Sequence, residues 1–146
     1  MSNDRFTITH CVFVAQEPTR VWTSLLHPSA RWMLGANIET SFQPGSKISF
    51  EGNFFGRKFA DHGEIIACER PRLLRFTHFS PLSGFEDIPE NYHDITLTLT
   101  PVDDGTQVSV IQANIISESR AARAATQWAK ALASLAHSRR EGHNAV

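Results

Sequence analysis

Two histidines, His78 and His93, have the residue type and the spacing that best fit acid/base chemistry in this sequence. Each lies in a segment with the alternating pattern of a β-strand, 73–79 and 92–100. Histidine titrates close to neutral pH, so two imidazoles that face each other across neighbouring strands can act as general acid and general base. Taken singly, each histidine is interpreted more simply as a core or rim residue. His78 and His93 are therefore the candidate catalytic residues.

The other titratable neighbours do not form such a pair. Asp61 and His62 are adjacent in sequence, as are Tyr92 and His93, and adjacent strand residues point to opposite faces of a sheet. A metal would need a third ligand, and no spacing indicates one, although Glu64 or His62 is conceivable. The sequence has no GxSxG, HExxH, P-loop or GxGxxG motif. We expect no metal and no cofactor.

Hydrophobic periodicity predicts the elements that position these residues. A strand is expected over 6–14, then a short helix from Pro18 to just before Pro28 and a second short helix between Ser29 and Gly35. A long helix is expected over about 117–138, with 141–146 as a frayed tail. The remaining strands are expected over 38–42, 47–51, 57–68, 73–79, 92–100 and 107–114. Hairpin-linked strands between helices indicate an α+β fold with an antiparallel sheet in a single domain, 1–146.

The composition favours a dry interior and excludes several partners. The chain has 146 residues, with ten Phe and three Trp but one Tyr, and Phe carries no hydrogen-bonding group. The 14 basic and 15 acidic residues sum to −1, which argues against a nucleic-acid-binding surface. No apolar run approaches the roughly 18 residues that span a bilayer, and the N-terminus lacks a signal-peptide core. We expect no membrane insertion, a cytoplasmic location, and two reduced packing cysteines, Cys11 and Cys68.

The charges are divided into zones along the chain. Residues 76–119 carry seven acids and no base, whereas residues 120–146 carry five bases and one acid. Exposed charges of this kind are usually solvated and contribute little. The alternative is a two-fold homodimer, in which the acidic loop 85–94 of one copy meets basic residues of another, namely Arg120, Arg123, Arg139 or Arg140.

A series of short motifs runs along nearly the whole chain. They are Ala15-x-x-Pro18-x-x-Val21-Trp22, Trp32, Pro44-Gly45, Gly63 followed by Pro71-Arg72-Leu73-Leu74, Asp104-Gly105-Thr106-x-Val108, and Trp128 with Leu132. In this order and spacing they resemble the SRPBCC or START-like superfamily, which has the helix-grip fold. Within it, the chain looks most like the bacterial branch related to the activator of heat shock protein 90 ATPase.

The resemblance implies a curved seven-stranded antiparallel sheet that grips the C-terminal helix around an elongated cavity. Proteins of this superfamily bind lipids, sterols, polyketides or plant hormones, and a minority are cyclases or other enzymes. Chaperone stimulation belongs to a eukaryotic relative with an additional domain, for which this chain has no spare length. A chaperone-associated interaction module is therefore kept as a second alternative. Fold analogy does not supply a function by itself.

We predict a helix-grip domain that binds a small hydrophobic, aromatic or lipid-like ligand in a cavity between the sheet and the C-terminal helix. The first alternative is a cyclase-, dehydratase- or hydrolase-type enzyme that uses His78 and His93. In the binding interpretation, aromatic side chains bury the ligand while histidine and glutamine orient its polar group. The predicted ligand contacts are Trp32, Phe50, Phe59, Phe76, His78, His93, Gln112 and Trp128.

Overall fold

The computed structural model describes residues 4–26 and 36–144. Within these ranges the element order is β1 (Phe6–Val14), α1 (Pro18–Leu25), β2 (Asn37–Thr40), β3 (Lys47–Phe54), β4 (Arg57–Glu69), β5 (Leu73–His78), β6 (His93–Val102), β7 (Gly105–Ile115) and α2 (Glu118–Asn144). Two 3₁₀ turns, η1 (Pro81–Ser83) and η2 (Pro89–Asn91), lie between β5 and β6. The predicted second short helix, with Trp32, falls outside the described residues.

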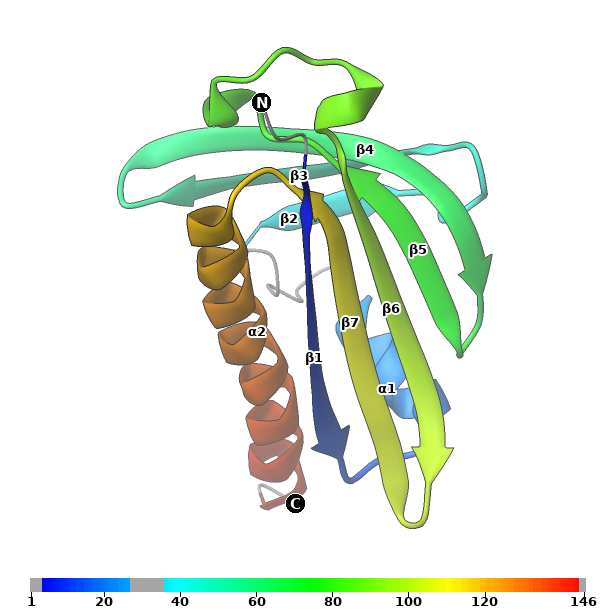
Figure 1. The fold of residues 1–146 in the computed structure, drawn as a ribbon. Coiled ribbons are helices and arrows are strands. Elements are labelled where there is room, and N and C mark those ends of the chain that lie inside the picture. The colour runs from blue at the N-terminus through cyan, green and yellow to red at the C-terminus, as the bar shows by residue number, and fades with distance from the viewer. Residues whose placement is uncertain (1–3, 27–35, 145–146) are drawn as a thin grey trace.

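The strands form one antiparallel sheet in the order β1-β7-β6-β5-β4-β3-β2. The sheet is strongly curved, because β4 bends and carries β2 and β3 across one end of the other strands (Figure 1). A register shift between Ile65 and Ala67 interrupts β4, close to the bulge that the sequence predicts near Gly63. The α+β helix-grip prediction is confirmed, and β5, β6 and β7 are neighbours.

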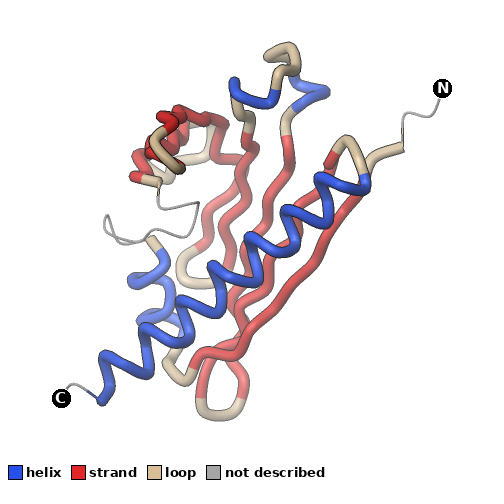
Figure 2. Tube along the Cα trace, turned by 90° about the vertical axis from the view of Figure 1, so that its left-hand side faces the viewer, coloured by secondary structure: helices blue, strands red, loops and turns tan. Residues whose placement is uncertain are grey.

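Alternating burial along the strands places the core on the concave face of the sheet. In β6, Ile95, Leu97 and Leu99 are buried, while the threonines between them face outward. The long helix α2 crosses this face diagonally, over β1 and β7 (Figure 2). It buries a stripe at helical spacing, as the sequence predicts: Ala121, Ala124, Trp128 and Leu132.

The ends of the helices follow local chemistry. Pro18 occupies the first turn of α1, and the Ser117 hydroxyl accepts the Arg120 N–H at 3.2 Å to cap α2. However, α2 continues to Asn144, so the helix extends past the predicted end near residue 138, and the frayed tail at 141–146 stays a prediction. The segment contains no proline, and basic Arg139 and Arg140 suit the negative end of the helix dipole, so nothing local stops the helix near residue 138.

Part of the acidic zone meets basic groups within one molecule. The Asp94 carboxylate accepts two hydrogen bonds from the Arg75 guanidinium, at 3.0 and 2.6 Å. The Arg120 guanidinium lies over the Phe85 ring, 5.0 Å from its centroid. These contacts need no second copy of the chain, and the two-fold homodimer stays a prediction.

Both cysteines are free, as expected, but they differ in environment. Cys68 is partly buried against the core. Cys11 is exposed, because its place in β1 puts it on the outward face, so it is not a packing residue. Within the described part of the chain, neither helix has the length and apolar character needed to cross a membrane.

Candidate functional site

The concave face carries a cluster of polar side chains among aromatic ones. Asp61 on β4, His78 on β5 and His93 on β6 form this cluster, which we call the inner cluster. The strand register pairs His78 with His93, and it pairs Asp61 with Phe50 on β3. Cross-strand partners share a face, and so does Phe76, two residues before His78. Ordinary strand alternation therefore gathers the cluster.

The inner cluster is tightly packed. The His78 Nε2–H donates to Asp61 Oδ2 at 2.9 Å, and the two side chains are 11% and 12% exposed. The rings of His78 and His93 stack with centroids 5.8 Å apart and planes 12° apart. Phe50 meets the His78 ring edge-on at 5.5 Å and lies 5.7 Å from Phe76. The rings of His78 and His93 therefore face each other, which is the condition that the acid/base interpretation of the pair requires.

Three buried atoms of the inner cluster lack a hydrogen-bond partner. They are Asp61 Oδ1, His78 Nδ1 and His93 Nδ1, which find no partner among the residues that the structure describes. Buried polar atoms in native proteins are almost always hydrogen-bonded, since leaving one unpaired costs about 1–3 kcal/mol. Three such atoms at one place are typical of a site that receives a polar group from outside the chain.

The environment of His93 keeps its ring neutral. Burial first, and then electrostatic interactions with His78, Arg120 and Arg5, lower the pKa of His93 to about 4, while Asp61 acts in the opposite direction. A neutral imidazole has one bare nitrogen and one N–H, so it can accept or donate a hydrogen bond. At neutral pH, His93 therefore adds hydrogen-bonding capacity to the site without adding charge.

The side chains of Gln112 and Trp128 are hydrogen-bonded to each other. Gln112 lies on the inward face of β7, where the register places it beside Ile95 of β6. Its Oε1 accepts the indole N–H of Trp128 at 2.7 Å, and both side chains are buried. The amide oxygen that was predicted to orient a ligand is thus occupied by the helix that covers the sheet. This contact anchors α2 to the sheet.

The Gln112–Trp128 hydrogen bond supports a stability prediction. Gln112→Leu is expected to destabilise the fold by about 1–3 kcal/mol, because it removes the buried acceptor to which the indole N–H of Trp128 donates. Trp128→Phe in the same background is expected to cost less than it does alone, which a double-mutant cycle in urea measures. Gln107→Leu, on the exposed outward face of β7, is the matched control and should stay within about 0.5 kcal/mol. Strict additivity of Gln112→Leu and Trp128→Phe would contradict the coupling.

Two predicted ligand contacts remain, Phe59 and Trp32. Phe59 is half-buried on β4 and shares a face with Asp61; its ring covers Gly52, where an added Cβ would lie 2.7 Å from Cζ. Trp32 falls outside the described residues. A separate open groove of about 390 Å³ lies beside α1 and β2, lined by Leu25, Leu26, Phe42 and residues 37–40. None of the described predicted contacts lines this groove.

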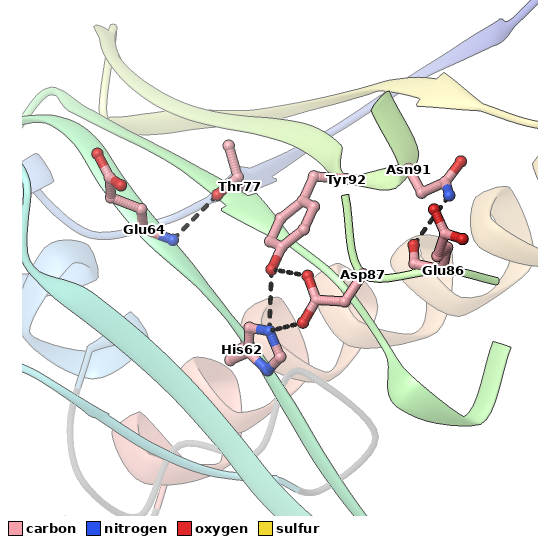
Figure 3. A network of polar contacts seen from close by, with 7 residues as sticks. All are labelled: His62, Glu64, Thr77, Glu86, Asp87, Asn91 and Tyr92. Carbon is pink, nitrogen blue, oxygen red and sulfur yellow. Dashed lines mark hydrogen bonds and ion pairs between the residues drawn. The ribbon is translucent and has the colours of Figure 1, made fainter. Parts of the chain in front are cut away.

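A second polar network occupies the opposite face of the sheet. The His62 Nε2–H lies 3.1 Å from Asp87 Oδ2 and 2.9 Å from the Tyr92 hydroxyl oxygen, and that hydroxyl donates to Asp87 Oδ1 at 2.5 Å (Figure 3). Burial and the Asp87 carboxylate raise the pKa of Tyr92 to about 12. The network ties the loop between β5 and β6 to β4. As the sequence predicts, His62 does not join Asp61, and Tyr92 does not join His93.

Asp61 is the residue of the inner cluster that sequence reasoning missed. It was considered only with adjacent His62, whereas strand parity puts it on the same face as Phe59, a predicted contact. Its partner His78 comes from the next strand, so the pair depends on register. Among the described residues, no group of three or more His, Cys, Asp or Glu side chains could hold a metal ion.

Comparisons with known proteins agree with this architecture. The family model for Activator of Hsp90 ATPase homolog 1-like protein matches residues 15–138. ChR145 from Cytophaga hutchinsonii, a solution structure, is 27% identical, is covered over 99% of both chains, and has a TM-score of 0.81. Ara h 8.0201 is 12% identical over 94% of this chain and 99% of its own, with a TM-score of 0.72. CalU16 from Micromonospora echinospora is 22% identical over 90% of this chain and 71% of its own, with a TM-score of 0.66.

The sheet and the long helix define a protein of the SRPBCC, or helix-grip, superfamily. Within it, the chain belongs to the Activator of Hsp90 ATPase homolog 1-like family. No curated protein matches the chain.

Proposed function

We propose that this protein binds a small, largely apolar molecule between the concave face of the sheet and α2. The observation that carries the proposal is the inner cluster, where three buried polar atoms that have no partner among the described residues lie beside Phe50 and Phe76. Small-molecule sites are mostly apolar, with a few polar groups that set orientation. Aromatic walls would bury the body of the ligand, while Asp61, His78 and His93 would receive its polar end.

The buried position of the inner cluster also favours ligand binding over a chaperone-associated interaction. Activation of a chaperone ATPase requires an exposed docking surface, whereas the inner cluster is buried on the concave face. A buried, incompletely paired polar cluster serves a molecule that enters the fold better than a partner that docks on the outside. Ligand binding is therefore the function that the geometry favours.

A neutral probe tests the binding function directly. N-phenyl-1-naphthylamine is expected to bind saturably in an NMR titration and to shift the ring signals of His78 and His93 and the indole N–H signal of Trp128. The His62 and Tyr92 side chains, on the opposite face, are the internal control and should not move. Native mass spectrometry of freshly purified protein is expected to show a retained small molecule. Shifts confined to the groove around Leu25–Phe42, or no saturable binding, would contradict the proposal.

One observation favours catalysis as a second candidate function. Asp61 accepts a hydrogen bond from His78 Nε2, so in a neutral His78 ring Nδ1 is a bare acceptor inside the fold. A base oriented by a carboxylate is a recurring arrangement in acid/base catalysis. Turnover of a bound molecule that His78→Gln abolishes, with binding retained, would establish this second function.

A further inference from the structure

The unpaired atoms of the Asp61–His78 pair are hydrogen-bond acceptors when the His78 ring is neutral. This follows from the position of the ring hydrogen. The Asp61 carboxylate accepts the hydrogen bond from His78, so the hydrogen of a neutral His78 ring sits on Nε2. In that neutral ring, His78 Nδ1 carries a lone pair and no hydrogen. Asp61 Oδ1 is likewise an acceptor without a donor among the described residues. With a neutral His78 ring, two of the three atoms, His78 Nδ1 and Asp61 Oδ1, are therefore acceptors.

His93 is compatible with a ligand that donates a hydrogen bond. Its Nδ1 is buried and unpaired among the described residues, and its ring can take either tautomer because no partner sets the hydrogen. The neutral ring can match a hydroxyl group as donor or as acceptor. The fixed part of the site is the Asp61–His78 pair.

We propose that the inner cluster recognises a hydrogen-bond donor, namely an alcoholic or phenolic hydroxyl, carried on an apolar or aromatic body. This inference rests on the proposed function and specifies its ligand class. A hydroxyl can donate its hydrogen to His78 Nδ1 or to Asp61 Oδ1, so it satisfies one of the two acceptors that have no partner among the described residues. A ligand carboxylate would instead face the carboxylate of Asp61 with a like charge.

Two nearby arginines raise the competing possibility of an anionic ligand. Arg120 and Arg5 act on the inner cluster through their positive potential, which would favour an anionic ligand. However, the Arg120 guanidinium lies over the Phe85 ring and is not hydrogen-bonded to the cluster in any contact of the described residues. The test must therefore compare a hydroxyl with a carboxylate on the same body.

Three probes that share one ring system make this comparison at pH 7.5. Isothermal titration calorimetry of 2-naphthol is expected to give a dissociation constant about tenfold or more below that of naphthalene, because the added bond joins a charged or strongly polar acceptor. Sodium 2-naphthoate is expected to bind more weakly than either. The inference is overturned if naphthol and naphthalene bind equally, which leaves the proposed function intact, or if naphthoate binds most tightly. Binding of none of the three contradicts the proposed function as well.

Two charge-removing variants on β4 locate the effect. Asp61→Asn is expected to reduce the preference for naphthol over naphthalene to less than about threefold and to relieve the penalty against naphthoate. Glu64→Gln removes the same charge from the exposed, outward side of the strand and should preserve the wild-type order of affinities. An unchanged naphthol preference in a folded Asp61→Asn variant also overturns the inference. If the Asp61→Asn variant does not fold, the affinities of the wild-type protein for the three probes test the inference by themselves.

Discussion

Gly63→Ala is expected to destabilise the protein by about 3 kcal/mol or more, enough to unfold a domain of ordinary marginal stability under mild denaturation. A Cβ at residue 63 would lie 1.7 Å from the carbonyl oxygen of Thr77 and 2.5 Å from its carbon. These are backbone atoms of β5, so no side chain can swing away to make room. Gly63 is also held on its other side, where it pairs with Ile48 of β3. Urea unfolding followed by circular dichroism measures the loss.

Gly56→Ala is the matched control for this substitution. A Cβ at Gly56 meets no atom within 4 Å, but the residue has a φ of +79°. The expected cost is therefore the conformational one, about 1–2 kcal/mol for an L-residue in the left-handed region. If Gly63→Ala costs no more than Gly56→Ala, the close approach of β4 and β5 is not the cause.

The position of Gly63 links this packing to the site. Strand register sets Gly63 opposite His78, and Asp61 lies two residues along β4 on the same face. Any separation of β4 from β5 at residue 63 would therefore also strain the hydrogen bond between Asp61 and His78. A Gly63→Ala variant that still folds is expected to lose the probe preference of the inner cluster.

Acidification is expected to destabilise the wild-type protein more than a His93→Gln variant, and the difference is expected to open between pH 6.5 and 4. The folded protein lowers the pKa of His93 to about 4, first by burial, from an ordinary value of 6.5. Between these values the unfolded chain binds more protons than the native protein, so stability falls as the pH falls. At about 1.4 kcal/mol per pKa unit, the wild-type penalty from this residue reaches about 3 kcal/mol near pH 4. Glutamine cannot take up the proton and escapes that penalty.

The pH prediction is measured by urea unfolding of both proteins at several pH values from 8 to 4. Carboxylates contribute to both curves, so the difference between the curves isolates His93. Arg120→Gln provides a second readout, because removing a positive charge should raise the pKa of His93 in an NMR titration of its ring. Curves for wild type and His93→Gln that stay parallel down to pH 4 would show that His93 is not held neutral.

Much of the fold follows from the sequence because its signals are local. Alternation along 93–102 and the helical spacing of Ala121, Trp128 and Leu132 each predict which residues share a face. Ser117 and Pro18 mark helix starts through interactions within a single turn. The end of α2 was harder to place, because stopping a helix near residue 138 requires a specific signal that the chain does not contain.

The candidate site is only partly visible in the sequence because side-chain partners depend on long-range register. Parity within each strand predicts the faces of His78, His93, Phe50 and Phe76, and these faces form one wall only if their strands are neighbours. Asp61 was missed because its partner lies on another strand.

The sequence by itself determined the residue faces, the order of elements and the resemblance to a family, because periodicity and motif spacing are written along the chain. Only the tertiary structure decided which faces meet. It placed Asp61 beside His78, and it paired the amide oxygen of Gln112 with the Trp128 indole. These choices depend on strand register and on where α2 crosses the sheet, and both are set by packing between residues distant in sequence. Among the described residues, that packing leaves one buried polar atom of Asp61 and one of His78 without a partner, which is why we propose that the polar end of the ligand binds there.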